Sequence, residues 1–364
     1  MKFDTIAYMQ WAKTQPYNDP ALLDFASSGM PYPAKRFDEL GIDTSRLPIW
    51  GANSYGYAVF REAIAARYRV KPENIFSAHG TSMANFVLLS LLTRNHRAII
   101  IEYPVYECLS APAESLGLKV LRLERLESEG WRYPLERAKK LAIQKNGGVF
   151  LLTNPHNPTG IFTPPEELDS LADSHKDVLV IVDEVYREWL PGEEGKTSAL
   201  SRPNIIATSS LTKIWGLGPL RAGWMIAEEQ WIKDAYRAFD HLSVVHPFAA
   251  DWLAGEVARS EGLLDRLRMK NLESLEHSRQ EVNYFLKKHL GHSIHTVMPI
   301  GGGIAFWRFT GMGGDAAAKE LLEKFNILVA PGSFFGSPNH VRVGWTKSPE
   351  NTRQALARLD RWLK

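Results

Sequence analysis

The stretch Val178-Leu-Val-Ile-Val-Asp-Glu-Val-Tyr186 decides the fold. Residues 178–182 are apolar without alternation, as expected of a strand that is buried on both faces of a parallel sheet. Further short apolar runs alternate with amphipathic stretches before and after it. These runs are Asn74–Ala78, Arg97–Ile101, Leu118–Arg122, Val149–Leu152, Ile205–Ala207 and Gly223–Ile226. The alternation predicts an α/β fold with a mostly parallel sheet flanked by helices.

After Phe248 the sequence changes to the period of a helix. A long amphipathic stretch places its apolar residues near one face, which predicts a helix that bridges two domains. These residues are Leu275, Val282, Phe285, Leu286 and Leu290. Strand-like runs and further helices follow it and predict a smaller α/β domain. The runs are Ala305–Phe309, Ile327–Val329 and Val341–Val343, and the helices are expected near 316–325 and 350–363.

A chain of 364 residues is long enough for two domains. We expect the parallel sheet and its helices to form a large domain over residues 48–260. The smaller domain would comprise residues 261–364 together with the turn-rich N-terminal segment 1–47. That segment is expected to pack against the smaller domain or against a partner subunit.

Composition excludes several classes of protein. Lys and Arg total 43 against 41 Asp and Glu, a net charge of +2, so nothing indicates a nucleic-acid partner. The single cysteine, Cys108, allows neither an internal disulfide nor a cysteine-based zinc site. The N-terminus lacks the apolar core of a signal peptide, and the apolar runs are shorter than a membrane span. We therefore expect a cytoplasmic protein without a membrane or metal partner.

Chemically unusual residues follow several of the predicted strands, where an open parallel sheet binds its ligands. Asp183 ends a fully apolar run, and a carboxylate there requires a cationic partner. Glu184 should point to the other side, because successive positions of an extended chain alternate. The segment Asn154-Pro-His-Asn-Pro-Thr-Gly160 reads as a rigid loop that presents side-chain amides. Within it, we expect His156 to be a surface residue rather than a catalyst.

Two further segments are suited to an anion. Ser209-Ser-Leu-Thr-Lys213 follows a buried strand and precedes glycines and Arg221. Ser210 and Arg221 together could bind a phosphate, the arginine through paired charge-assisted hydrogen bonds. Gly80-Thr-Ser82 leads from a strand into a helix, whose N-terminus offers free N–H groups to an anion. Alone, this second segment could equally be a helix cap.

Taken together, these motifs resemble the class I/II aminotransferase family of fold-type-I pyridoxal-phosphate (PLP) enzymes, in the right order and across most of the chain. The resemblance implies that Lys213 holds PLP as an aldimine and then acts as the base at the substrate α-carbon. It implies that Asp183 keeps the pyridine nitrogen protonated. Asn157 and Tyr186 would hydrogen-bond the ring hydroxyl oxygen.

The same resemblance assigns the remaining site residues. The cofactor phosphate would be held by Gly80, Thr81, Ser82, Ser210 and Arg221. Tyr106 would stack on the cofactor ring, and Arg342, in His340-Val-Arg-Val-Gly344, would bind the substrate α-carboxylate. A family tyrosine that reaches the neighbouring subunit's site falls here at Gly51, so that role is assigned to the nearby Tyr55. The family also implies a homodimer.

The function expected from this resemblance is transfer of an amino group between an α-amino acid and a 2-oxo acid. A PLP-dependent β-lyase or decarboxylase would use nearly the same cofactor site and stays open as an alternative. A serine acyl hydrolase is disfavoured because Lys196-Thr-Ser198 precedes Ser210-x-x-Lys213 rather than following it. A dinucleotide-binding protein lacks its glycine motif here, and a cofactor-binding regulator without turnover is a further alternative. His246 is either a packed or surface histidine or an additional site residue.

Overall fold

A central seven-stranded sheet organises the computed structural model, which describes residues 2–49, 51 and 55–364. The strand order is β2-β8-β7-β6-β5-β3-β4, and β8 runs antiparallel to both of its neighbours while the other pairs are parallel. The bounds are β2 Ile75–Ala78, β3 Ala98–Tyr103, β4 Lys119–Glu124, β5 Gly148–Thr153, β6 Val178–Asp183, β7 Ile205–Ser210 and β8 Gly223–Ile226. The predicted α/β fold with a mostly parallel sheet is confirmed.

Helices cover both faces of this sheet. Val180 and Val182 pack into an apolar cluster with α5 and α6, whereas Ile181 packs into a second cluster with α3, α4 and α7. Burial on both faces is the physical reason why β6 is apolar without alternation. The helix bounds are α2 Ala58–Tyr68, α3 Thr81–Leu92, α4 Glu107–Ser115, α5 Leu135–Gln144, α6 Pro165–Ala172, α7 Glu229–Phe239 and α8 Phe248–Arg259.

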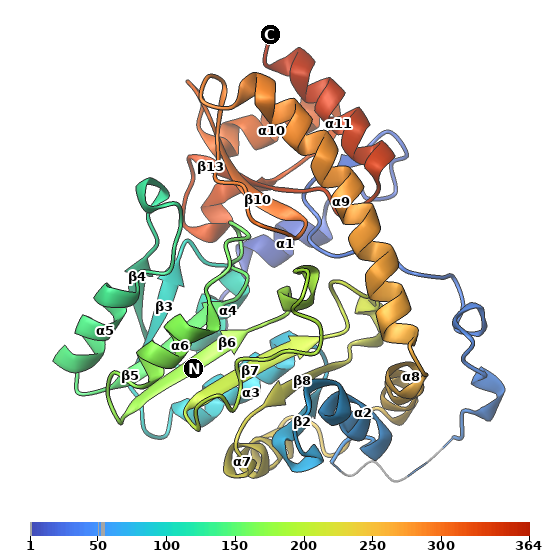
Figure 1. The fold of residues 1–364 in the computed structure, drawn as a ribbon, viewed down its shortest axis with the longest axis vertical. Coiled ribbons are helices and arrows are strands. Elements are labelled where there is room, and N and C mark those ends of the chain that lie inside the picture. The colour runs from blue at the N-terminus through green and yellow to red at the C-terminus, as the bar shows by residue number, and fades with distance from the viewer. Residues whose placement is uncertain (1, 50, 52–54) are drawn as a thin grey trace.

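The long helix α9 (Leu263–His289) connects this layer to a second sheet. Figure 1 shows α9 running from α8, beside the large sheet, to α11, which packs along it. The predicted bridging helix is thus confirmed, except that Leu290 lies beyond its end and is 47% exposed. Within the described residues, no helix combines the length and the apolarity needed to cross a membrane.

The second sheet has four strands in the order β12-β13-β10-β9. Its elements are β9 Ile294–His295, β10 Ile304–Phe309, α10 Gly314–Phe325, β12 Ala330–Pro331, β13 His340–Gly344 and α11 Pro349–Trp362. The N-terminal segment adds α1 (Ala7–Lys13) and β1 (Leu23–Asp24), and β1 pairs with β11 (Ile327–Leu328) beside this sheet. β1 therefore packs beside the smaller sheet, as the sequence predicted for this segment, whereas the main-chain N–H of Met30 already donates to the Lys213 carbonyl of the large layer. The domain boundaries at residues 48 and 260 stay a prediction.

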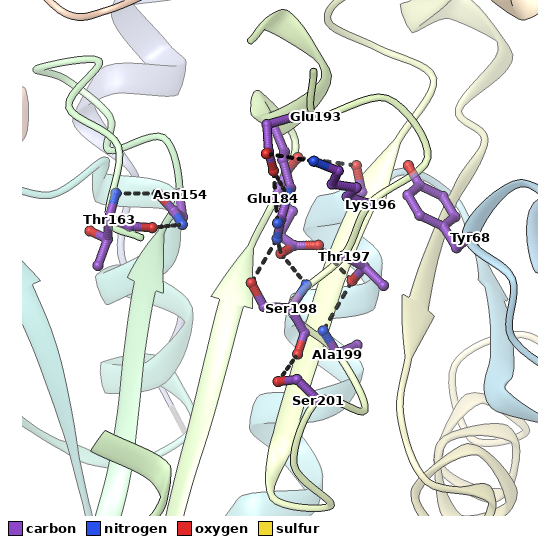
Figure 2. A network of polar contacts seen from close by, with 12 residues as sticks. Tyr68, Asn154, Thr163, Glu184, Glu193, Lys196, Thr197, Ser198, Ala199 and Ser201 are labelled. Atoms are coloured by element: carbon purple, nitrogen blue, oxygen red, sulfur yellow. Dashed lines mark hydrogen bonds and ion pairs between the residues drawn. The ribbon is translucent and has the colours of Figure 1, made fainter. Parts of the chain in front are cut away.

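A buried ion-pair network braces the turn after β6. Glu184 Oε1 accepts hydrogen bonds from Arg187 Nη1 at 2.5 Å and from the Ser198 main-chain N–H at 2.7 Å, and its Oε2 accepts from Thr197 at 2.7 Å. Arg187 Nε also donates to Glu193 at 2.9 Å. Figure 2 shows Glu184 pointing into this network. As the sequence predicted, Glu184 and Asp183 face different surroundings.

We expect Arg187→Met to destabilise the fold by about 3–5 kcal/mol, because it leaves the buried carboxylate of Glu184 without its cation. The matched control is Arg353→Met, which removes an exposed ion pair with Glu281 and should cost at most about 1 kcal/mol. Denaturant unfolding of both variants measures the difference. Equal losses in the two variants would contradict the role assigned to this network.

Candidate active site

The carboxyl ends of β5, β6 and β7 lie side by side. The strand register pairs Thr153 of β5 with Asp183 of β6, and Asp183 with Thr208 of β7. Parallel strands end at a common edge, so the residues that follow them are brought together there. The loop 154–160, Asp183 and the segment that leads to Lys213 are therefore neighbours, as predicted.

Asp183 is a buried carboxylate that is bonded to neutral donors. Its Oδ2 accepts a hydrogen bond from Asn85 Nδ2 of α3 at 3.0 Å, and its Oδ1 accepts from the Val185 main-chain N–H at 3.1 Å. Thr208 Oγ1 donates to Asn85 Oδ1 at 2.7 Å and so orients the amide. Burial raises the pKa of Asp183 to about 6, although these hydrogen bonds and the charge of Lys213 act in the opposite direction. Among the described residues, no cation is hydrogen-bonded to this carboxylate.

Lys213 and Tyr186 meet at the hydroxyl of Ser28. Lys213 Nζ donates to Ser28 Oγ at 3.1 Å, and Tyr186 Oη donates to the same oxygen at 2.9 Å. Lys213 Nζ also lies 5.3 Å from the centroid of the Tyr186 ring. The amine is therefore oriented by a hydroxyl and an aromatic ring. Its charge also acts to lower the pKa of Asp183.

Arg342 lies at the centre of β13, and its side chain is buried. Its Nη1 donates to Asn157 Oδ1 at 3.0 Å, and its Nη2 donates to Tyr8 Oη at 3.0 Å and to the Ala26 carbonyl at 2.8 Å. Its Nε is buried and has no acceptor among the residues that the structure describes. The partners of the guanidinium are all neutral, so a carboxylate would complete its hydrogen bonding.

The segment Ala26–Ser28 joins the two cations of the site. Its Ala26 carbonyl accepts from Arg342, and its Ser28 hydroxyl accepts from Lys213. Main-chain hydrogen bonds tie the preceding Phe25 to Leu328 and to Gly344. The N-terminal segment is thereby part of the site rather than a peripheral arm.

The predicted phosphate-binding residues gather around β8. This strand pairs Gly223 with Ala78 of β2 on one side and with Ser210 of β7 on the other. Gly80 caps α3 with a φ of 82°, a conformation that favours glycine. A Cβ atom on Gly80 would lie 2.4 Å from Arg221 Nη2, and one on Gly223 would lie 2.5 Å from the carbonyl carbon of Gly80. Only glycine at both positions permits this close approach.

The side chains around this turn are mostly hydrogen-bond donors. Thr81 Oγ1 is buried and has no partner within the described part of the chain. Ser210 Oγ lies 3.0 Å from Thr212 Oγ1, Ser82 is exposed, and Arg221 is exposed and donates to two main-chain carbonyls at 3.3 Å. Beside the N-terminus of α3, these groups form a set of donors suited to an anion.

Tyr106 lies beside Tyr8 and Met9 of α1, whereas Tyr55 packs against α7. Tyr106 precedes α4, its hydroxyl lies 3.7 Å from Met9 Sδ, and its ring meets the Tyr8 ring edge-on at 5.0 Å. Tyr55 is 54% exposed and packs against Tyr236 of α7, with ring centroids 5.1 Å apart. The described contact of Tyr55 is therefore to α7 rather than to the residues around Lys213.

The loop 154–160 is rigid, but its histidine is not at the surface. Asn154 exchanges two hydrogen bonds with the main chain of Thr163, at 2.8 and 2.9 Å (Figure 2). His156 is 0% exposed, with Nδ1 at 2.7 Å from Thr159 Oγ1 and Nε2 at 2.8 Å from the Pro104 carbonyl. The surface position expected for His156 was wrong, because the ring ties this loop to the end of β3.

His246 is a packed histidine. It is buried and stacks on Phe239 with ring centroids 4.4 Å apart, and its Nδ1 lies 3.4 Å from Asp251 Oδ2. His79 adds a third polar group, so that potential ligand atoms of His79, His246 and Asp251 lie within 4.8 Å of one another. Burial lowers the pKa of His246 to about 4, and it also lowers the pKa of His79, with nearby arginines acting in the same direction. Those arginine charges oppose a cation at this cluster.

Sequence reasoning missed three side chains of the site. Ser28 lies in a turn-rich segment, Asn85 lies within an otherwise apolar helix, and Tyr8 lies near the N-terminus. Asn85 could have been found from the sequence. Its amide lies one turn into an apolar helix, and the N-terminus of that helix is assigned to an anion. Ser28 and Tyr8 offered no comparable pattern, because their partners are far away in the sequence.

Comparison with protein families gives a match over most of the chain. A family model described as aminotransferase class I and II matches residues 51–359. The chain is 25% identical over 316 residues to capreomycidine synthase of Streptomyces vinaceus, covering 84% of this chain and 79% of that protein. It is 24% identical over 334 residues to aspartate aminotransferase of Bacillus subtilis (strain 168), covering 85% of this chain and 83% of that protein.

A solved structure shows the same fold. A PLP-dependent aminotransferase from Streptococcus suis 89-1591 superimposes with a TM-score of 0.86 at 22% sequence identity, and the alignment covers 100% of this chain and 98% of that chain. The arrangement of a seven-stranded sheet, a bridging helix and a small sheet is thus that of a known enzyme fold.

The titration of Asp183 predicts a pH dependence of stability. The pKa of its carboxyl is 3.8 when unperturbed and about 6 in the folded protein. Between these pH values the folded state therefore binds a proton that the unfolded state has released. Stability of the cofactor-free protein should therefore fall as the pH rises from about 4 to about 6. Asp183→Asn should remove up to about 3 kcal/mol of this fall.

Denaturant unfolding across this pH range measures the effect, with Asp177→Asn, at an exposed position, as the control. An unchanged pH dependence in Asp183→Asn would contradict the assigned cause.

Proposed function

Because the chain belongs to the aminotransferase class I and II family and is therefore a pyridoxal-phosphate-dependent transferase, we propose that it moves an amino group between an α-amino acid and a 2-oxo acid. One observation carries this proposal. The segment Ala26–Ser28 contacts the Lys213 amine on one side and the buried Arg342 guanidinium on the other. An amine and a carboxylate-binding group on either side of one short segment suit an α-amino acid.

The surroundings of Asp183 fit the ring of the cofactor. Its carboxylate is buried among neutral donors, and burial raises its pKa. A protonated pyridine nitrogen is the cation that would stabilise it. Asn85 would keep the carboxylate oriented, while Asn157 and Tyr186 would bind the ring hydroxyl oxygen. Tyr106 would cover one face of the ring.

The donors around the N-terminus of α3 fit the cofactor phosphate. The hydroxyl of Thr81 is buried without a partner in the described residues, and a phosphate oxygen would supply one. Gly80, Ser82, Ser210 and Arg221 would complete the binding set. Gly80, at a φ of 82°, adopts a conformation that favours glycine and lets Arg221 approach this turn closely.

When bound, PLP supplies an electron sink for charge that develops at the substrate α-carbon. The protein must then hold and move a proton at that carbon. Lys213 is the candidate base, because its Nζ is oriented by Ser28 and faces the Tyr186 ring. Arg342 binds the α-carboxylate and so fixes which bond of the α-carbon faces the lysine.

A β-lyase or a decarboxylase is the second candidate function. Capreomycidine synthase is 25% identical to this chain and is not named an aminotransferase. A chain similar to this one is thus named for another reaction. Product analysis separates the candidates. Transamination converts an added 2-oxo acid into an amino acid, a β-lyase releases the β-substituent together with ammonia and a 2-oxo acid, and a decarboxylase releases carbon dioxide and an amine.

We further propose a cytoplasmic homodimer with the domain boundaries given above. Support for an interface comes from exposed apolar side chains between α7 and α8, of which Val244 is 82% exposed. Tyr236 of α7 packs against both Tyr55 and His246, so Tyr55 lies on the same side. Tyr55 would reach the neighbouring subunit from there, and light scattering would give the mass in solution.

Lys213→Ala should lower kcat by about 10²- to 10⁴-fold or more, because it removes the group that moves the proton. Turnover is measured with a pool of amino acids and an added 2-oxo acid. The matched control is Lys176→Ala, at an exposed position, which should retain wild-type turnover. Wild-type turnover by Lys213→Ala would refute the assignment of the lysine.

Arg342→Ala should raise KM for amino acids by about tenfold to a hundredfold, because hydrogen bonds to charged groups contribute roughly 1.5–3 kcal/mol. Affinity for the cofactor should change much less, since the residues assigned to the phosphate lie at the N-terminus of α3 and around β7 and β8, away from β13. The control is Arg308→Ala. Arg308 lies on the same small sheet as Arg342, and the change removes its ion pair with Glu127. An unchanged KM would place the carboxylate site elsewhere.

A further inference from the structure

Helix α1 is anchored to the site from its first turn. The main-chain N–H groups of Ala7 and Tyr8 donate to the Glu107 carboxylate at 3.1 and 2.7 Å. The helix has no side-chain cap of its own at Ile6, so Glu107, the first residue of α4, takes that role. Because Glu107 directly follows Tyr106, α1 is fixed relative to a residue already assigned to the site.

The side chain of Tyr8 is oriented by aromatic rings. Its ring meets Tyr106 edge-on at 5.0 Å and Phe334 edge-on at 5.7 Å. Trp11, one turn further along α1, lies 5.7 Å from it. With the ring constrained on several sides, the hydroxyl points at Arg342 and accepts from its Nη2 at 3.0 Å.

Hydrogen-bond accounting at Arg342 leaves groups for a ligand. A guanidinium has five N–H donors, and those of Nη1 and Nη2 reach Asn157, Tyr8 and Ala26. The buried Nε has no acceptor among the described residues. The Tyr8 hydroxyl accepts from Arg342 and still carries its own proton, for which the described residues supply no acceptor. An anion beside Arg342 would satisfy both groups.

We propose that Tyr8 is a second substrate-binding residue, whose hydroxyl donates a hydrogen bond to the carboxylate held by Arg342. This inference rests on the proposed function. Accepting from a cation strengthens the hydroxyl as a donor, since linked hydrogen bonds polarise one another. The aromatic neighbours of Tyr8 exclude water from the carboxylate, and α1 thereby forms one wall of the substrate site.

Binding of a simple carboxylate tests this inference apart from catalysis. The holoenzyme is titrated with unbranched monocarboxylates from acetate to hexanoate, and Kd is read from the cofactor absorbance. Tyr8→Phe keeps the ring and removes the hydroxyl, so it should weaken binding and raise KM for amino acids by about tenfold. Its kcat and its affinity for the cofactor should match those of the wild type.

Two controls separate the hydroxyl from the packing of α1. Tyr284→Phe removes an exposed hydroxyl on α9 and should leave Kd unchanged. Glu107→Gln weakens the anchor of α1 but keeps the Tyr8 hydroxyl, so it should raise Kd and make trypsin cleave faster at Lys13. Wild-type Kd and KM in Tyr8→Phe would overturn the inference, even if Glu107→Gln weakened binding.

The outcome for Arg342→Ala distinguishes this inference from the proposed function. Loss of carboxylate binding in Arg342→Ala with wild-type binding in Tyr8→Phe would overturn only the role of Tyr8. If Arg342→Ala bound the monocarboxylates as tightly as the wild type, Arg342 would not form the carboxylate site. Failure of all the monocarboxylates to bind the wild-type holoenzyme would also contradict that site, and both proposals would then fall.

Discussion

The contacts of the short segment Ala26–Ser28 are the constraint on which the site depends. One carbonyl and one hydroxyl of this segment accept hydrogen bonds from Arg342, in β13 of the small sheet, and from Lys213, which follows β7 of the large sheet. The main chain of Phe25 fixes the segment against the small sheet. Together with the hydrogen bond from Arg342 to Asn157, these contacts set the relative position of the two cations.

Buried groups whose charge or hydrogen bonding the described residues do not complete indicate which ligand groups the proposed site would bind. Asp183 is a buried anion among neutral donors, Arg342 Nε is a buried donor, and Thr81 Oγ1 is a buried hydroxyl. Leaving such groups unpaired costs roughly 1–3 kcal/mol each. A protonated ring, a carboxylate and a phosphate are the complementary groups. Binding them would offset this cost and would therefore also stabilise the folded protein.

Elements outside the family-matched range complete the site. The match begins at residue 51, whereas Tyr8 and Ser28 come earlier in the chain and contact Arg342 and Lys213. The residues proposed for the cofactor come from the matched range, whereas Tyr8 and Ser28 contact the two side chains proposed to act on the substrate. The aminotransferase structure from Streptococcus suis aligns over 100% of this chain, so the N-terminal segment belongs to the shared fold although the family model begins after it.

The sequence by itself determined the strands of the large sheet, the bridging helix and the residues at the ends of those strands, because apolar period and turn chemistry are local properties. It also placed Asp183 and Glu184 on different sides. Only the tertiary structure decided that Ser28 meets Lys213 across 185 residues and that Tyr8 meets Arg342 across 334. It also buried His156, whose acceptor comes from the end of another strand. Such contacts depend on which polar groups packing brings together, and no local pattern encodes that.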